Sequence, residues 1–161
     1  MINIESPYRQ RRAATIHINA PADDVFALMC PVREYEWEPG WTTNRIISAS
    51  GLVEEGCIFT TPAGASEGSD ANSAEALWTT PIHDPDMRRL MMIKFTPGEC
   101  VTRLDIDVEA QVTGCSVDVA YEHTALSEAG RKVVDAHTEE NFAAMMARWR
   151  RVIPEHVKKA G

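Results

Sequence analysis

The sequence predicts an α+β fold in which a curved antiparallel sheet of about seven strands surrounds a long C-terminal helix, with two short helices after the first strand. Two observations support this prediction. Polar and apolar residues alternate at 13–20 and again through 102–124, as they do in strands that are buried on one face only. Residues 128–153 then carry an apolar stripe at helical spacing, which needs a long dry surface to cover it. We treat 1–161 as a single domain whose core spans about 12–156.

The two short helices are predicted from the residues that follow the first strand. Pro21 suits the first position of a helix, and two aspartates follow in the first turn, where negative charge is favourable. Pro31 ends this helix, and residues 32–37 predict a further turn or two. We expect Trp37 and Trp41 to lie on the loop that comes next and, where the fold encloses a pocket, to close one end of it.

Four further strands are predicted at 43–50, 57–61, 74–83 and 87–96, because each is bounded by residues that favour turns. The stretch 62–73 is rich in glycine, alanine, serine and aspartate, and it predicts a mobile loop.

The last hairpin has the clearest alternation. One face of its first strand carries Thr102, Leu104, Ile106, Val108 and Ala110. The matching face of its second strand carries Cys115, Val117, Val119, Tyr121 and His123. The alternate residues along each strand, which point to the opposite face, are mostly polar or charged. This hairpin therefore supplies a dry face for the final helix.

Ser127 is a suitable N-cap for the final helix. We expect this helix to run without interruption over 128–153, because Pro154 is the first proline after its start. Its length is then roughly 39 Å at 1.5 Å per residue. The buried stripe consists of Val134, Thr138, Phe142, Met145, Trp149, Val152 and Ile153.

Composition narrows the classes of function. The chain has a formal net charge of −8 and a pI near 5.1, and an acidic surface repels nucleic-acid phosphates, so we expect no nucleic-acid partner. The four cysteines lack zinc-site spacing and are expected to be buried thiols, and we expect neither a metal nor a cofactor. The longest apolar run, 142–147, is too short to insert across a membrane, and the polar N-terminus shows no secretory signal. We therefore expect a cytoplasmic protein.

Several local motifs point to a known superfamily. Residues 16–26 run from a strand through Ala-Pro-Ala into an acidic helix, and residues 56–59 begin a strand with Gly-x-x-Phe. Asp84-Pro85 suits a turn between middle strands, and 121–127 leads into the last helix. With the order of the elements, these motifs resemble the START/Bet v 1-like (SRPBCC) superfamily, in its polyketide cyclase/dehydrase and lipid-transport branch. The resemblance implies a helix-grip fold, whose members include lipid carriers and aromatic cyclases.

The resemblance also implies a mostly apolar cavity between the sheet and the helix. Its expected walls on the strands are Trp78, Ile82, Met91, Ile93, Phe95, Leu104, Ile106, Val117, Val119 and Tyr121. Its expected walls on the helix are His137, Thr138, Asn141, Phe142 and Met145. For each of these side chains, ordinary core packing is the more common role.

Three functions remain open, and the residues do not decide whether the protein is an enzyme. The leading hypothesis is binding of an apolar small molecule, lipid-like or polyketide-like, with the oligomeric state open and a dimer not excluded. The second is a cyclase or dehydratase in which Tyr121, His123 and Asn141 move protons, although His123 at the cavity rim could instead bond to backbone or water. The third is a co-chaperone-like module, for which an exposed apolar patch at Trp37 and Trp41 would be the sign.

Overall fold

The computed structural model describes residues 2–64 and 74–160, and within them it contains one seven-stranded antiparallel sheet with strand order β1-β7-β6-β5-β4-β3-β2. The strands are β1 (Arg9–Ile18), β2 (Arg45–Ile47), β3 (Ile58–Thr61), β4 (Ala76–Asp84), β5 (Arg89–Thr96), β6 (Cys100–Ala110) and β7 (Cys115–Ala125). The helices are α1 (Ala22–Leu28), the short 3-10 helix η1 (Glu34–Glu36), α2 (Glu128–Ala136) and α3 (Glu139–Ala160). The predicted α+β helix-grip architecture is confirmed, while most of the loop predicted at 62–73 lies outside the described residues.

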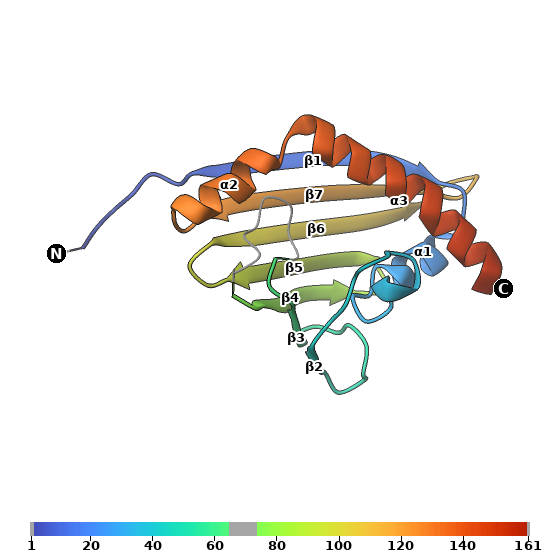
Figure 1. Ribbon diagram of the computed structural model, residues 1–161. Coiled ribbons are helices and arrows are strands. Elements are labelled where there is room, and N and C mark those ends of the chain that lie inside the picture. Colours follow the sequence, from blue (N-terminus) through green and yellow to red (C-terminus); the bar gives the residue numbers. More distant parts are fainter. Residues whose placement is uncertain (1, 65–73, 161) are drawn as a thin grey trace.

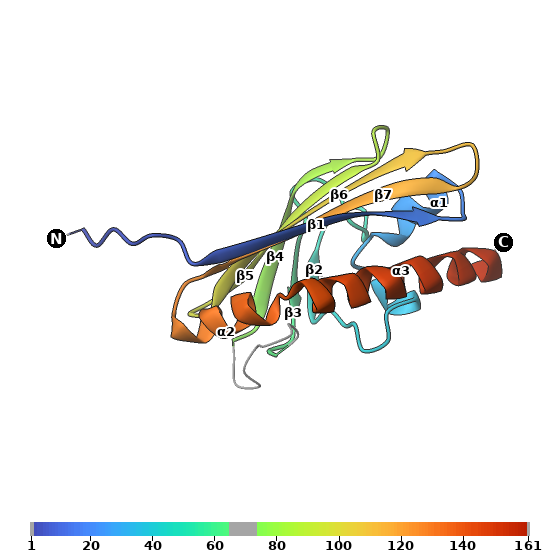
Figure 2. The ribbon, with the colours of Figure 1, turned by 90° about the horizontal axis from the view of Figure 1, so that it is seen from above.

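Both C-terminal helices cover one face of the sheet. Figure 1 shows α2 and α3 running across the sheet near β1 and β7, with α1 close to the far end of α3. Figure 2, seen from above, shows that α2 and α3 lie on the same side of the curved sheet. None of the described helices combines the length and the apolar character that crossing a membrane requires.

The β6–β7 hairpin has the faces that its sequence predicts. The inward side chains of β6 from Thr102 to Val108 are buried, as are those of β7 from Cys115 to Val119. The outward face of β6 carries charged side chains. One of them, Asp107, forms an ion pair with Arg89 of β5, with Nε of Arg89 2.8 Å from Oδ1 of Asp107. This charged face lies toward solvent, so the buried face is the one that meets the helices.

The faces of β5 differ from the prediction. Met92 pairs with Leu104 and Lys94 pairs with Thr102, so Met92 and Lys94 point inward. The predicted wall residues Met91, Ile93 and Phe95 therefore point outward, as does their neighbour Ile82 on β4, which pairs with Met91. The prediction was wrong here because four consecutive apolar residues, 90–93, contain no alternation that fixes a face, and because the inward Lys94 reverses the usual pattern of polarity.

The final helix also differs from the prediction, because it is two helices. The chain leaves helical geometry at His137, and the hydroxyl of Thr138 accepts a hydrogen bond from the backbone N–H of Asn141 at 3.1 Å, which starts α3. Helix α3 then continues through Pro154, whose missing N–H would otherwise bond to the exposed Arg150. The predicted N-cap at Ser127 is confirmed, since its hydroxyl accepts a hydrogen bond from Gly130 N–H.

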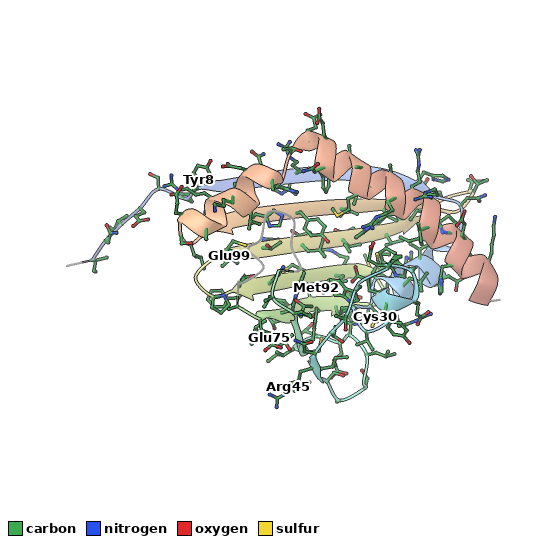
Figure 3. All side chains as sticks on the ribbon, in the orientation of Figure 1. Tyr8, Cys30, Arg45, Glu75, Met92 and Glu99 are labelled. Carbon is green, nitrogen blue, oxygen red and sulfur yellow. The ribbon has the colours of Figure 1, made fainter. Side chains whose placement is uncertain are left out.

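Helix α2 sits very close to the β5–β6 turn. A Cβ atom at Gly130 would lie 1.8 Å from the carbonyl oxygen of Glu99, so only glycine permits this approach. On the other side of α2, Tyr8 donates a hydrogen bond to Asp135 at 2.6 Å, and Figure 3 shows Tyr8 beside this helix. These contacts fix α2 against the sheet ends, while the first half of α3 spans the space between the sheet and η1.

Candidate functional site

A cavity of about 610 Å³ lies between the inner face of the sheet, helices α2 and α3, and the segment that begins at η1. Its aromatic lining consists of Trp41, Trp78, Tyr121, Phe142 and Trp149. Its polar and charged lining consists of Glu34, Glu38, Thr42, Thr61, Lys94, Thr102, His123, His137, Asn141 and Arg148. The volume falls within the range of small-molecule sites, and a mostly apolar wall with a few polar groups is their usual chemistry.

Trp78 of β4 forms the centre of the aromatic wall. It stacks on the buried Phe59 of β3 with ring centroids 5.3 Å apart, and Trp41 meets it edge-on at 6.0 Å. The indole N–H of Trp78 donates to the hydroxyl of Thr61 at 3.1 Å, and that of Trp41 donates to the carbonyl of Pro31 at 2.8 Å. Each indole is therefore held at two points, so this wall is ordered before any ligand enters.

Trp41 thus closes one end of the cavity, as the sequence predicts. Trp37 lies deeper: it is buried, meets Trp149 of α3 edge-on at 5.5 Å, and donates its indole N–H to the carbonyl of Leu28. Neither indole forms the exposed patch that a co-chaperone-like surface would need.

Three polar side chains form a row across the adjacent strands β5, β6 and β7. Lys94 pairs in register with Thr102, which pairs with His123. The hydroxyl of Thr102 and Nδ1 of His123 are hydrogen-bonded at 2.7 Å, and the His123 ring meets that of His137 edge-on, with centroids 4.5 Å apart. Lys94 is 5% exposed, and its ammonium nitrogen lies 5.4 Å from the centroid of the Trp78 ring.

Burial sets the protonation of this row. Burial, together with the smaller effects of His137 and Lys94, lowers the pKa of His123 to about 3, so His123 is neutral throughout the physiological range. Burial also lowers the pKa of Lys94 and that of His137. The row and the adjacent His137 therefore present neutral imidazoles beside an amine whose charge is disfavoured by its surroundings.

Carboxyl groups from η1 and the residues after it lie at another wall of the cavity. Glu38 forms an ion pair with Arg148 of α3 at 2.7 Å. The pKa of Glu34 is raised to about 8, chiefly by burial and also by the Glu38 carboxylate, while Arg148 acts in the opposite direction. Part of the Glu34 side chain is open to the cavity, but surrounding protein still removes much of the hydration that its charged form requires. Glu34 is consequently mostly protonated at pH 7.

The predicted wall residues divide into four groups. On the cavity wall lie Trp78, Tyr121, His137, Asn141, Phe142 and Met145. Leu104 and Ile106 line a recess of about 20 Å³ beneath the cavity, and Val117 and Val119 are core residues. Thr138 is exposed at the break between α2 and α3 and lies away from the cavity, as do the outward residues of β5.

Sequence reasoning missed the charged residues of the cavity, namely Glu34, Glu38, Lys94 and Arg148. For Lys94 a signal was present, because a lone lysine interrupts the apolar run of β5. For Glu34 the signal was weaker: three glutamates alternate between 34 and 38, and nothing in that spacing tells which of them turns inward.

The structure brings the predicted catalytic residues together, but their contacts and the basicity of His123 make them weak proton-transfer groups. The rings of Tyr121 and His123 are 6.2 Å apart, while the amide of Asn141 already donates to the carbonyl of Ala136 at 2.8 Å. His123 lines the cavity, is half-buried, and is bonded through Nδ1 to the Thr102 hydroxyl. With a pKa near 3 it is a weak base, whereas an efficient general base has a pKa near the working pH. A cavity group whose raised pKa, about 8, meets this condition is Glu34.

No metal centre is found among residues 2–64 and 74–160, where no three histidines, cysteines or carboxylates are grouped to hold an ion. The four cysteines are buried, free thiols, as predicted. The curved sheet, the C-terminal helix across it and the cavity between them define a helix-grip protein with the fold of the START/Bet v 1-like superfamily.

Comparisons with solved structures find the same fold in several proteins. Norcoclaurine synthase from Thalictrum flavum, in complex with dopamine and hydroxybenzaldehyde, matches with a TM-score of 0.62 at 16% identity, over 97% of this chain and 96% of its own. An uncharacterised protein from Rhizobium leguminosarum matches with a TM-score of 0.62 at 10% identity, over 98% and 99%. Ara h 8.0201 matches with a TM-score of 0.59 at 10% identity, over 95% and 97%. No family model and no curated protein matches the sequence.

Proposed function

We propose that this protein binds one small, largely aromatic molecule in the cavity between its sheet and α3. The observation that carries the proposal is the cavity itself: about 610 Å³, bounded by five aromatic side chains and a few polar groups. Its indoles are held by hydrogen bonds and ring contacts, so little ordering is needed when a ligand enters. A ligand that is planar and aromatic in part would gain from the faces and edges of these rings.

The solved structure of norcoclaurine synthase supports this class of ligand, because it contains two small aromatic molecules in a protein of the same fold. Lipid-like ligands fit the cavity less well. Its walls carry ionisable groups on two sides, Lys94 on one and Glu34 with the Glu38–Arg148 pair on the other, and a long hydrocarbon chain would cover these groups without bonding to them.

A second candidate is a cyclase or dehydratase acting on a polyketide-like substrate. One observation favours it: Glu34 carries a proton with a pKa of about 8, which suits proton transfer near neutral pH. In such an enzyme Glu34 transfers a proton to or from the substrate, and Tyr121 and His123 hold substrate oxygens by hydrogen bonds. Loss of turnover on changing Glu34 to glutamine, with the substrate still bound, would favour the enzyme over a carrier.

Filling the cavity is expected to abolish binding. Met145 of α3 lines the cavity, so Met145→Trp replaces open volume with an indole, and we expect the affinity for the uncharged dye N-phenyl-1-naphthylamine to fall by about tenfold or more. The measurement is a fluorescence titration of the dye against wild type and variant. Saturation at one dye per chain is expected for the wild type.

Met91→Trp is the matched control, since Met91 lies on the outward face of β5 and receives the same substitution. It is expected to leave the dye affinity unchanged. Thermal unfolding of both variants checks that they fold. Equal binding by the two tryptophan variants, or a wild-type signal that never saturates, would contradict the proposal.

A further inference from the structure

The carboxyl group of Glu34 is set apart from the other acids of its segment. Glu36 accepts a hydrogen bond from Arg33 at 3.1 Å and lies 3.1 Å from His156, and Glu38 is paired with Arg148. Among residues 2–64 and 74–160, by contrast, no side chain or backbone group forms a hydrogen bond or ion pair with the Glu34 carboxyl.

Glu34 instead faces the cavity and the small recess beneath it. It lines both, together with the rings of Trp41, Trp78 and Tyr121. A carboxyl group in such surroundings is unfavourable unless something bonds to it. Arg148, the cation whose charge acts on Glu34, is already paired with Glu38, so a ligand in the cavity can supply the partner that the Glu34 carboxyl lacks among the described residues.

We propose that Glu34 recognises a nitrogen base, and that the ligand of this cavity is an aromatic amine whose protonated nitrogen pairs with the Glu34 carboxylate. This inference rests on the proposed function, since it specifies which aromatic molecules the cavity selects. A cationic nitrogen beside Glu34 also meets the electron-rich faces of the surrounding indole and phenol rings. A ligand carboxylate at the same place would meet Glu34 and Glu38 and be repelled.

The position of Lys94 across the cavity from Glu34 determines how the amine ligand is oriented. Lys94 belongs to the row on β5, β6 and β7, where Thr102 and His123 offer further hydrogen-bonding atoms. A cationic nitrogen is disfavoured near Lys94 and favoured near Glu34. The amine therefore points toward η1, and the ring or an oxygen acceptor points toward the row.

Pairing with a cation couples binding to proton release. The empty cavity holds Glu34 protonated, with a pKa of about 8, so the carboxyl has to lose its proton when the amine binds. The ionisable groups that face it are Glu38 and Arg148, Tyr121 of β7, and, across the cavity, Lys94, His123 and His137. Affinity for the amine is expected to rise roughly tenfold per pH unit from pH 6 and to level off near pH 8.

Three ligands of similar size test the inference by isothermal titration calorimetry: 2-phenylethylamine, 2-phenylethanol and 3-phenylpropanoate. At pH 8 the wild type is expected to bind the amine at least about tenfold more tightly than the alcohol, and the anion most weakly. At pH 7, titrations in buffers of different ionisation enthalpy should show close to one proton released per amine bound. Glu34→Gln should remove both the preference and the proton release while changing the affinity for the alcohol less than about threefold.

Glu36→Gln, two residues away on η1, is the matched control and should keep the amine preference, because Glu36 faces Arg33 and His156. Equal affinity for amine and alcohol, or a preference that survives in Glu34→Gln, would overturn the inference. Preferential binding of the anion, lost in Lys94→Met, would overturn it in favour of an acid-binding site. If neither these ligands nor N-phenyl-1-naphthylamine binds, the proposed function fails as well, so the two failures are distinguishable.

Discussion

Replacing Glu34 with glutamine is expected to stabilise the protein by about 2–3 kcal/mol at pH 9 and to change its stability little at pH 4.5. The reason is that the folded protein holds Glu34 where its charge is poorly solvated, while the unfolded chain ionises it freely. At pH 4.5 the carboxyl is protonated in the folded state, and glutamine resembles it. At pH 9 only the wild type has to accommodate a negative charge in the cavity wall.

The direction of this pH dependence follows from the raised pKa of Glu34. A group whose pKa is higher in the folded state favours folding below its ordinary pKa of 4.5, and this contribution is lost as the pH rises through about 8. Each pKa unit corresponds to about 1.4 kcal/mol, so the loss has a ceiling of about 5 kcal/mol. Water in the cavity solvates the Glu34 carboxylate and makes the actual loss of stability smaller than this ceiling. Urea denaturation at pH 4.5, 7 and 9 measures that loss.

Glu36→Gln provides the control of opposite sign. Arg33 and His156 lower the pKa of Glu36, so this carboxylate favours folding above its ordinary pKa, and its contribution is lost as the pH falls. Its replacement should destabilise the protein by about 0.5–1 kcal/mol at pH 7. A wild type and a Glu34→Gln variant with parallel stability curves from pH 4.5 to 9 would show that Glu34 is well solvated.

Replacing Phe59 with alanine is expected to destabilise the protein by about 3–5 kcal/mol. Phe59 is 1% exposed and supports Trp78 from beneath by ring stacking, so its loss leaves a hole under the cavity wall. Because Trp78 loses this support, dye affinity should fall along with stability. Urea denaturation and dye titration at a temperature where the variant is folded measure both effects.

Phe95→Ala is the matched control for this prediction. Phe95 lies on the outward face of β5, is 43% exposed and stands opposite Leu77 of β4. Loss of one exposed cross-strand pair costs about 1 kcal/mol or less, and the cavity is untouched. Similar losses of stability in the two variants would mean that Phe59 is not a buried support of the wall.

The sequence was sufficient for the parts of the fold in which polarity alternates. The β6–β7 hairpin has one apolar and one charged face, so both its strands and their orientation were predictable. The run 90–93 of β5 lacks such alternation, and pairing with β6, a long-range contact, decides that Met92 faces inward. The break at His137 was hidden for a related reason: no proline or glycine marks it, and it is made by the hydrogen bonds of Thr138 and Asn141.

The candidate site was predictable only in its apolar half. Tyr121, Phe142 and Met145 were placed on the wall by helix and strand periodicity, and the structure brings them together. Glu34 and Lys94 were not, because a charged residue in a sequence is normally assigned to the surface. Their inward positions depend on the packing of η1 and the register of β5, and such departures from local rules occur most often where a protein acts.

The most direct test of ligand binding in this cavity uses the methionine methyl groups as reporters. In NMR spectra of protein labelled with ¹³C at these methyls, titration with N-phenyl-1-naphthylamine should shift the signal of Met145, which lines the cavity, through the ring currents of the bound dye. Met87 and Met91, in the β4–β5 turn and on the outward face of β5, should keep their positions. Movement of the Met87 or Met91 signal while Met145 stays fixed would place the dye outside the cavity and contradict the account.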